Sequence, residues 1–157
     1  MVTAVTERFA RYNAYLESVI ELEIGDDAVY ALSFPEDGST AASEEHPLLD
    51  RIEDYLSGAV EDDFRDVSIR LDGDEHERAV LKTVRTVPYG EGVSVTDLAR
   101  EIPSMTAENV TDEDRIREIL ATNPIPVIIP DHRVRDGPSA APPRVEQRLR
   151  SLELIAG

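Results

Sequence analysis

Asp131 and His132 are the two neighbouring residues of this chain whose types are best suited to chemistry. They follow a short apolar run that three prolines interrupt, from Asn123 to Pro130. Each proline removes a backbone donor and fixes φ, so the run predicts a rigid, mostly buried extended segment and not a helix. Such a segment would hold the pair in one place, where a carboxylate can act as a covalent nucleophile beside an imidazole. The alternative is a buried linker whose polar end merely reaches solvent.

The residues around this pair predict a mainly helical second half. Residues 77–86 are amphipathic and predict a helix. Ser94-x-x-Asp97 and Thr111-x-x-Asp114 are typical of the capped starts of two short helices, with a turn at 88–92 and a loop at 103–110. Two short helices joined by a turn after a longer one match a helix-turn-helix. We therefore interpret residues 76–157 as a helix-turn-helix domain.

The first half predicts a small α/β domain over residues 1–75. Residues 1–13 predict a short helix or an ordered lead-in, and residues 15–24 and 28–34 predict two strands of a hairpin around the turn at 25–27. A polar loop follows from 35 to about 45. Apolar residues at helical spacing after Pro47 predict a helix over 47–56, and alternation at 67, 69 and 71 predicts a further strand.

Composition excludes several kinds of chemistry. The chain has 157 residues and no cysteine, so it can form no disulfide, thiolate metal site or cysteine nucleophile. The three histidines lie far apart in the sequence, and we expect neither a metal site nor a cofactor. No apolar run approaches the length of a membrane span and no signal-peptide pattern is present, so we expect a cytoplasmic protein without a membrane partner.

The charge is strongly negative and unevenly distributed. The net charge is −17, of which residues 1–75 carry −15 and residues 76–157 only −2. Lys82 is the sole lysine among 16 basic residues. We interpret this pattern as adaptation to a very salty cytoplasm, a halophilic character in which carboxylates keep the protein soluble. In molar salt the Debye length falls to about 3 Å, so acidity does not exclude DNA binding, and the near-neutral half is where a DNA surface would lie.

The proline-rich segment resembles the active-site loop of the O6-alkylguanine-DNA alkyltransferases, whose pattern is Asn-Pro, apolar residues, then Pro-Cys-His-Arg-Val. The matching residues are Asn123, Pro124, Pro126, Pro130, His132, Arg133 and Val134. Glu77 to Leu81, Val87 to Glu91, Ser94 and Leu98-Ala99 fall in the order of the family. The resemblance implies a ribonuclease H-like α/β N-terminal domain and a mainly helical, winged-helix-like C-terminal domain.

The same resemblance assigns roles by position. The family's cysteine accepts the alkyl group from guanine O6, and this chain has Asp131 there. His132 matches the histidine that deprotonates the thiol, and Asn123 matches the asparagine that braces the turn. The glutamate that orients the histidine aligns with Ile155, with Glu153 two residues before it. Without the resemblance, the residues around Asp131 favour a different role, in which Asp131 is solvated and paired with Arg133 or Arg135.

The positions that handle DNA in the family depart from its pattern. Where the family has a Ser-Tyr pair, this chain has Ser94-Val95. The family's arginine, which fills the space that the flipped base leaves, aligns with Asp114, and Arg115 is one residue away. The remaining candidate phosphate contacts are Arg117, Arg133 and Arg135.

These departures lead to three functional hypotheses. The first is a DNA-binding protein of the alkylation-damage response, similar to the cysteine-less alkyltransferase-like proteins, which binds double-stranded DNA without methyl transfer and has alkylguanine as its candidate lesion. A repair protein is then a candidate partner. The second is a degenerate family member that serves as a protein-interaction module. The third is dealkylation through Asp131, with His132 hydrolysing the ester.

Overall fold

The computed structural model describes residues 5–36 and 43–155. An antiparallel sheet of order β1-β2-β3 forms the first part, from β1 (Glu7–Asn13), β2 (Ser18–Gly25) and β3 (Ala28–Ser33). Asp26 and Asp27 join β2 to β3, both at positive φ, which gives the turn the twist that a two-residue hairpin requires. The predicted hairpin is confirmed. The polar loop predicted over 35–45 lies partly outside the described residues.

The prediction of a helix or lead-in over residues 1–13 was wrong where the structure describes it. β1 pairs with β2 along its whole length, from Glu7 opposite Ile24 to Asn13 opposite Ser18. A strand forms here because cross-strand pairing overrides weak local preference. The strand predicted at 67–71 is also absent. That segment is extended beside β3 and forms an isolated bridge between Val29 and Ile69.

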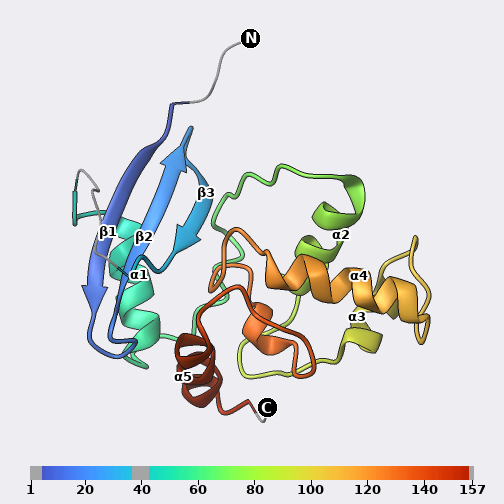
Figure 1. Ribbon diagram of the computed structural model, residues 1–157. Helices are drawn as coiled ribbons and strands as arrows, with labels where there is room; N and C mark the ends of the chain where they lie inside the picture. Colours follow the sequence, from blue (N-terminus) through green and yellow to red (C-terminus); the bar gives the residue numbers. More distant parts are fainter. Residues whose placement is uncertain (1–4, 37–42, 156–157) are drawn as a thin grey trace.

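Helix α1 (Pro47–Leu56) has the predicted bounds and packs against the sheet with its apolar side (Figure 1). His46 caps it, because its Nδ1 accepts a hydrogen bond from the Leu48 backbone N–H at 3.0 Å. Arg11 of β1 fixes the helix from outside through ion pairs of 2.9 Å to Asp50 and Glu53.

The second part is helical, as predicted. It comprises α2 (Glu75–Val84), α3 (Val95–Glu101), α4 (Val110–Ala121), the 3₁₀ helix η1 (Asp131–Arg133) and α5 (Pro143–Glu153). Ser94 and Asp97 form the predicted capping box of α3. The cap predicted at Thr111 was wrong: α4 starts earlier, with the Asn109 side chain accepting from the Asp112 N–H at 3.0 Å.

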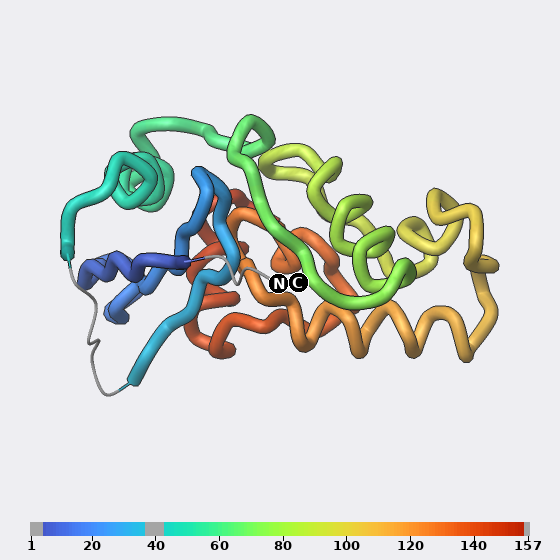
Figure 2. Tube along the Cα trace, turned by 90° about the horizontal axis from the view of Figure 1, so that it is seen from above, coloured from blue at the N-terminus to red at the C-terminus, as the bar shows by residue number. Residues whose placement is uncertain are grey.

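The two parts share one hydrophobic core that extends from Leu16 in the sheet region to Leu149 in α5. Figure 1 and the view from above in Figure 2 show the sheet and α1 at one end of the molecule and α2, α3 and α4 at the other. The segment between α4 and α5 lies between these ends, so both contribute to its surroundings. Within the described ranges, every helix is too short or too polar to cross a membrane.

The position of the α4 cap gives a stability prediction. Asn109→Ala removes the hydrogen bond to the first turn and should lower the free energy of unfolding by about 1 kcal/mol. Thr111→Ala is the matched control, because Thr111 is exposed inside the first turn, and it should change stability by no more than a few tenths of a kcal/mol. Urea unfolding of both variants in high KCl checks this. A larger loss for Thr111→Ala would contradict the assigned cap.

Candidate functional site

Asn123 holds the proline-rich segment in its shape. Its side-chain amide donates to the Ile129 carbonyl and to Asp131 Oδ2, both at 3.0 Å, while its Oδ1 accepts from the Ile125 N–H at 3.0 Å. The carbonyl of Pro124 accepts from the Leu32 N–H of β3 at 2.9 Å, which attaches the segment to the sheet. The turn is therefore fixed both from inside and from the neighbouring sheet.

The turn also contains a strained residue. Val127 has a φ of 77°, a conformation that is costly for a β-branched side chain. It is buried and lies between Pro126 and Ile129, which form an isolated bridge. Pro126 and Pro130 are buried with it, whereas Pro124 is exposed. The packed surroundings keep this strained turn in place, and the turn sets the direction of Asp131.

Asp131 is completely buried, with an exposed fraction of 0%. Its Oδ1 accepts from the Ser139 hydroxyl at 2.6 Å, and its Oδ2 accepts from the Asn123 amide at 3.0 Å and the Ala140 N–H at 2.9 Å. The expectation of a solvated aspartate paired with Arg133 or Arg135 was wrong. The carboxylate instead connects the proline-rich segment to the loop that leads into α5.

Burial governs the ionisation of Asp131. Loss of hydration raises the pKa of this carboxyl group, and the hydrogen bonds from Ser139, Ala140 and Asn123 work in the opposite direction. The three groups that donate to the carboxyl group are all neutral. A carboxylate with both oxygens occupied in this way has few lone pairs left for a reaction.

A second buried carboxylate, Glu153, lies next to this site. Its Oε2 accepts from His132 Nε2 at 2.7 Å, and its Oε1 accepts from Arg133 Nε at 2.7 Å and from the Gly90 N–H at 2.9 Å. The hydroxyl of Tyr55, from α1, also donates to Oε2. The glutamate beside the histidine is therefore Glu153, and the alignment of that role with Ile155 was wrong.

The end of α5 separates the two candidate residues. Leu154 has a left-handed backbone and ends the helix, so Ile155 no longer follows the helical face that carries Glu153. Positional counting along a continued helix cannot detect this stop.

The donors around Glu153 define its charge and the state of His132. Burial alone would raise the pKa of Glu153, but the hydrogen bonds and the field of His132 and Arg133 outweigh it and lower the pKa to about 2. An ionised carboxylate only accepts, so His132 Nε2 must carry the proton. In the described part of the chain, Nδ1 of His132 is buried without a hydrogen-bond partner. Burial and the Glu153 charge raise the pKa of Tyr55 well above 10.

Arg133 was predicted to contact phosphate, and the structure excludes this. The side chain is buried, and its Nη1 donates to the Val87 carbonyl at 2.8 Å and to Asp63 at 3.2 Å, in addition to the pair with Glu153. A buried guanidinium that neutralises a buried carboxylate cannot reach the backbone of DNA. Its role is structural.

The remaining predicted DNA contacts lie on or near α3 and α4. Val95 is buried, with its N–H donating to Asp136, so the prediction that its side chain contacts DNA was wrong. Ser94 is used as the cap of α3. The exposed residue Arg135 lies against Gly92, whose missing side chain leaves room for the arginine stem. Arg135 and α3 are close enough for its charge to lower the pKa of Asp97, an effect smaller than that of the Ser94 cap.

The charged residues of α4 are already paired. Arg115 is turned toward Asp74 at 3.0 Å and Glu77 at 3.4 Å. Arg117 pairs with Asp114 at 3.4 Å, and both are at least partly exposed. These are surface pairs, so each contributes little stability and can exchange partners.

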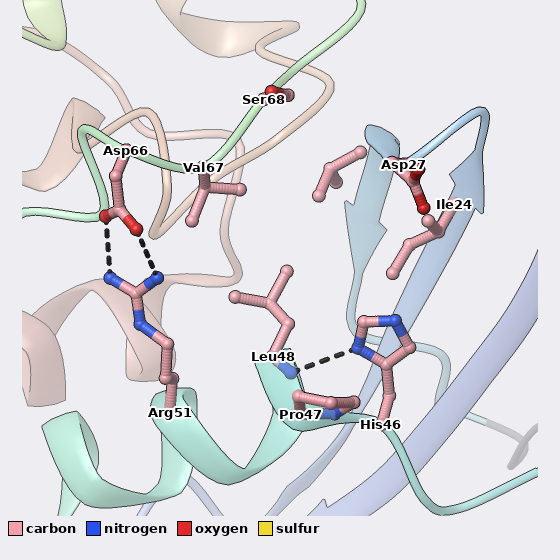
Figure 3. A pocket seen from close by; sticks show the side chains of 10 residues that line it. Ile24, Asp27, His46, Pro47, Leu48, Arg51, Asp66, Val67 and Ser68 are labelled. Carbon is pink, nitrogen blue, oxygen red and sulfur yellow. Dashed lines mark hydrogen bonds and ion pairs between the residues drawn. The ribbon is translucent and has the colours of Figure 1, made fainter.

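A separate hollow lies between α1 and the sheet (Figure 3). It has a volume of about 320 Å³ and apolar walls that include Leu48 and Val67. Arg51 at its edge is bound to Asp66 and Asp62, at 2.8 to 3.0 Å. None of the predicted site residues lines this hollow. The described ranges also contain no group of three or more histidines and carboxylates arranged for a metal ion.

Sequence reasoning missed three members of the site. Tyr55 lies in the helix predicted over 47–56, but nothing in the sequence places it beside Glu153. Ser139 and Ala140 lie in a stretch rich in small residues and proline, and Ala140 contributes only its backbone N–H. Between Ser139 and Ala140, only Ser139 could be proposed from its residue type, because it has a hydroxyl group eight residues after Asp131.

The low pKa of Glu153 predicts a specific acid sensitivity. Its folded pKa of about 2 lies below the ordinary value of 4.5, so its stabilising effect is complete above pH 4.5 and is lost as the pH falls toward 2. Glu153→Gln removes the buried charge partner of Arg133 and leaves it only the longer pair with the half-buried Asp63, so it should cost about 3–5 kcal/mol near neutral pH. The difference in unfolding free energy between wild type and variant should shrink between pH 4.5 and 2.

Urea unfolding at a series of pH values in high KCl measures that difference. Glu118→Gln is the matched control, because this carboxylate on α4 is exposed and makes only a surface pair with Arg115. A difference for Glu153→Gln that stays constant with pH would show that Glu153 is not the ionised centre of the cluster.

Comparisons with known proteins identify relatives of this chain. Residues 75–139 match the family described as "6-O-methylguanine DNA methyltransferase, DNA binding domain". The chain is similar to the methylated-DNA–protein-cysteine methyltransferase of Metallosphaera sedula, with 28% identity and 92% of each chain covered. It is 33% identical to the protein of the same name from Methanopyrus kandleri over 69% of this chain and 79% of that protein.

Solved structures show the same fold. The O6-methylguanine methyltransferase of Mycobacterium tuberculosis superimposes with a TM-score of 0.74 at 20% identity, covering 96% of this chain and 92% of that one. The M. tuberculosis OGT in complex with DNA superimposes with a TM-score of 0.72 at 22% identity, covering 96% and 94%.

Proposed function

Since this chain belongs to the methylated-DNA–protein-cysteine methyltransferase family, we propose that it binds double-stranded DNA in the response to alkylation damage without accepting the alkyl group. The observation that carries this proposal is the state of the acceptor position. The chain has no cysteine, and the residue in its place, Asp131, is buried with both oxygens hydrogen-bonded. In this respect the chain is similar to the alkyltransferase-like proteins.

The chemistry of a carboxylate supports the absence of transfer. A carboxylate is a weak nucleophile toward an alkyl ether, and hydrogen bonds to both of its oxygens lower its reactivity further. Dealkylation through Asp131 would require these bonds to break and His132 to hydrolyse the resulting ester. The contacts of Asp131 therefore favour binding over catalysis.

Two of the residues that the resemblance assigns to the active-site loop, Asn123 and His132, are held by hydrogen bonds in this structure. Asn123 braces the turn, and His132 is held by Glu153 at 2.7 Å. These bonds hold the active-site loop in its shape without a cysteine nucleophile. A retained scaffold with a replaced nucleophile favours a role in recognition.

We assign DNA binding to the second half, residues 76–157, with α3 and α4 as a helix-turn-helix in a winged-helix-like domain. The first half, residues 1–75, is then the ribonuclease H-like α/β domain of the family. The match of residues 75–139 to a DNA-binding domain supports this assignment, as does the likeness to the M. tuberculosis OGT in complex with DNA. Within this surface Arg117 and Arg135 are the candidate phosphate contacts, and Arg115 is a further candidate once it leaves Asp74.

Charge determines the conditions under which this surface can work. The protein carries −17 overall, so DNA is repelled at low ionic strength. At molar KCl the Debye length is about 3 Å, so only close contacts between arginine and phosphate contribute to the electrostatic attraction. We therefore expect duplex binding to be measurable in high salt, in agreement with the halophilic composition.

The alternative is a protein-interaction module without a DNA role, and one observation favours it. The arginines of α4 are already neutralised by carboxylates, and the first turn of the helix contains Asp112 and Glu113. These two acids are partly used inside the fold, since they accept backbone N–H bonds from Thr106 at 2.9 Å and Glu108 at 2.6 Å. A helix start of this charge suits a basic protein surface, such as that of a repair partner, better than a phosphate backbone.

Arg135 provides the test of the DNA surface. Arg135→Ala should weaken binding to a fluorescent duplex. It should also reduce the slope of log Kd against log [KCl] by about one, because one phosphate contact fewer releases about one counterion fewer. Arg8→Ala is the matched control, because Arg8 is an exposed arginine on β1 in the other half. Fluorescence anisotropy at several KCl concentrations measures both. Equal weakening by the two substitutions would show that binding follows net charge and not this surface, and no duplex binding by the wild type would support the protein-interaction alternative.

A further inference from the structure

The family's acceptor position is closed in this protein by its own side chain. We propose that Asp131 removes lesion specificity: it prevents O6-alkylguanine from reaching the position that aligns with the family's acceptor, so that alkylated and unmodified duplexes bind equally. The proposal rests on the DNA-binding function above and specifies which DNA is bound. Two independent features of Asp131 support it, namely how it is enclosed and what it presents to a base.

The first feature is steric. A base that leaves the helix must reach the side chain at position 131, and Asp131 exposes none of its surface. Ser139 and Ala140, which lie in the segment before α5 and form a covering segment, donate to the carboxylate, and so does Asn123, through hydrogen bonds of 2.6 to 3.0 Å. The carboxylate thus occupies, together with its donors, the place where an alkyl group would have to lie.

The covering segment is itself well fixed. The Ser139 hydroxyl that donates to Asp131 also accepts from the Ala141 N–H at 3.0 Å, and Ala141 is buried. Gly137 packs so closely on Leu120 and Val134 that a Cβ there would lie 2.7 Å from Leu120. Lifting this segment would leave a carboxylate and several donors unpaired in the interior, and each such loss is costly.

The second feature is electrostatic. Alkylation at O6 removes the N1 proton of guanine, so the edge that carries the lesion presents lone pairs at N1 and O6. An ionised carboxylate also presents only lone pairs. The oxygens of Asp131, which act as acceptors in this structure, would therefore repel the modified edge, whereas the N1–H donor of unmodified guanine would not be repelled. Charge and enclosure act in the same direction, against the lesion.

Asp131→Ser separates this proposal from general DNA binding. Serine is small and neutral, so it frees the space of the carboxylate and removes the repulsion, while its hydroxyl can still bond to Asn123 or Ser139. We expect wild type to bind a duplex with one O6-methylguanine and its unmodified twin with equal Kd. The variant should prefer the methylated duplex by roughly 10-fold, the order that one well-placed methyl group contributes in an apolar pocket.

Two further variants control the comparison. Asp131→Asn keeps the size of the side chain and most of its bonds, so it should remain without preference. Asp54→Ser removes one exposed carboxylate from α1, far from the site in sequence, and controls for the change in net charge. It should leave the ratio of the two Kd values at one.

A binding measurement with a nucleoside in place of DNA tests the proposal even if no duplex binds. Ligand-observed NMR with O6-methyl-2′-deoxyguanosine should show no binding to wild type and binding to Asp131→Ser, with a folded amide spectrum as the check on the variant. A wild type that prefers the methylated duplex, or that binds the nucleoside, would overturn the proposal while leaving DNA binding intact. A folded Asp131→Ser variant that binds no nucleoside would overturn it as well. Absence of duplex binding with the expected nucleoside results would refute the proposed function alone.

Discussion

The buried carboxylate of Glu153 is the interaction on which the rest of the structure depends. It accepts hydrogen bonds from Tyr55 of α1, from the backbone of Gly90 after α2, and from His132 and Arg133 of η1. A buried negative charge is tolerated only when it is fully paired, so these four groups must stay together for the protein to fold. Because they come from both halves of the chain, the same requirement joins the sheet region to the helical region around one core.

The replacement at position 131 depends on that framework. Glu153 holds η1, and Asn123 holds the strained turn before it, so the backbone position of residue 131 is set independently of its side chain. A carboxylate there meets donors from Ser139 and Ala140 and becomes part of the interior. The side chain at the position that aligns with the family's acceptor is thus part of the packed interior. This is the physical reason why we propose DNA binding without alkyl transfer for this protein.

Much of the fold could be predicted, but the site could be predicted only in part. The hairpin, α1 and the Ser94 capping box follow from local signals, namely turn residues, helical spacing and a capping pair. β1 was missed because its partner strand, and not its own composition, makes it a strand. Arg133 was taken for a surface residue because arginine usually is one, and only the tertiary structure shows the buried Glu153 that it neutralises. The Ala140 donor is a backbone group, for which the residue type carries no signal.

The most direct test of the central claim, that the framework around position 131 survives the loss of the acceptor cysteine, is transfer of a labelled methyl group from a methylated duplex to protein, for wild type and Asp131→Cys in high KCl. A thiol next to the His132–Glu153 pair should accept the methyl group, and wild type should accept none. Label that becomes stably bound to wild type would contradict the account, because it would show a reactive carboxylate or imidazole where a structural one is described. A folded Asp131→Cys variant without label would contradict the claim that the framework is intact.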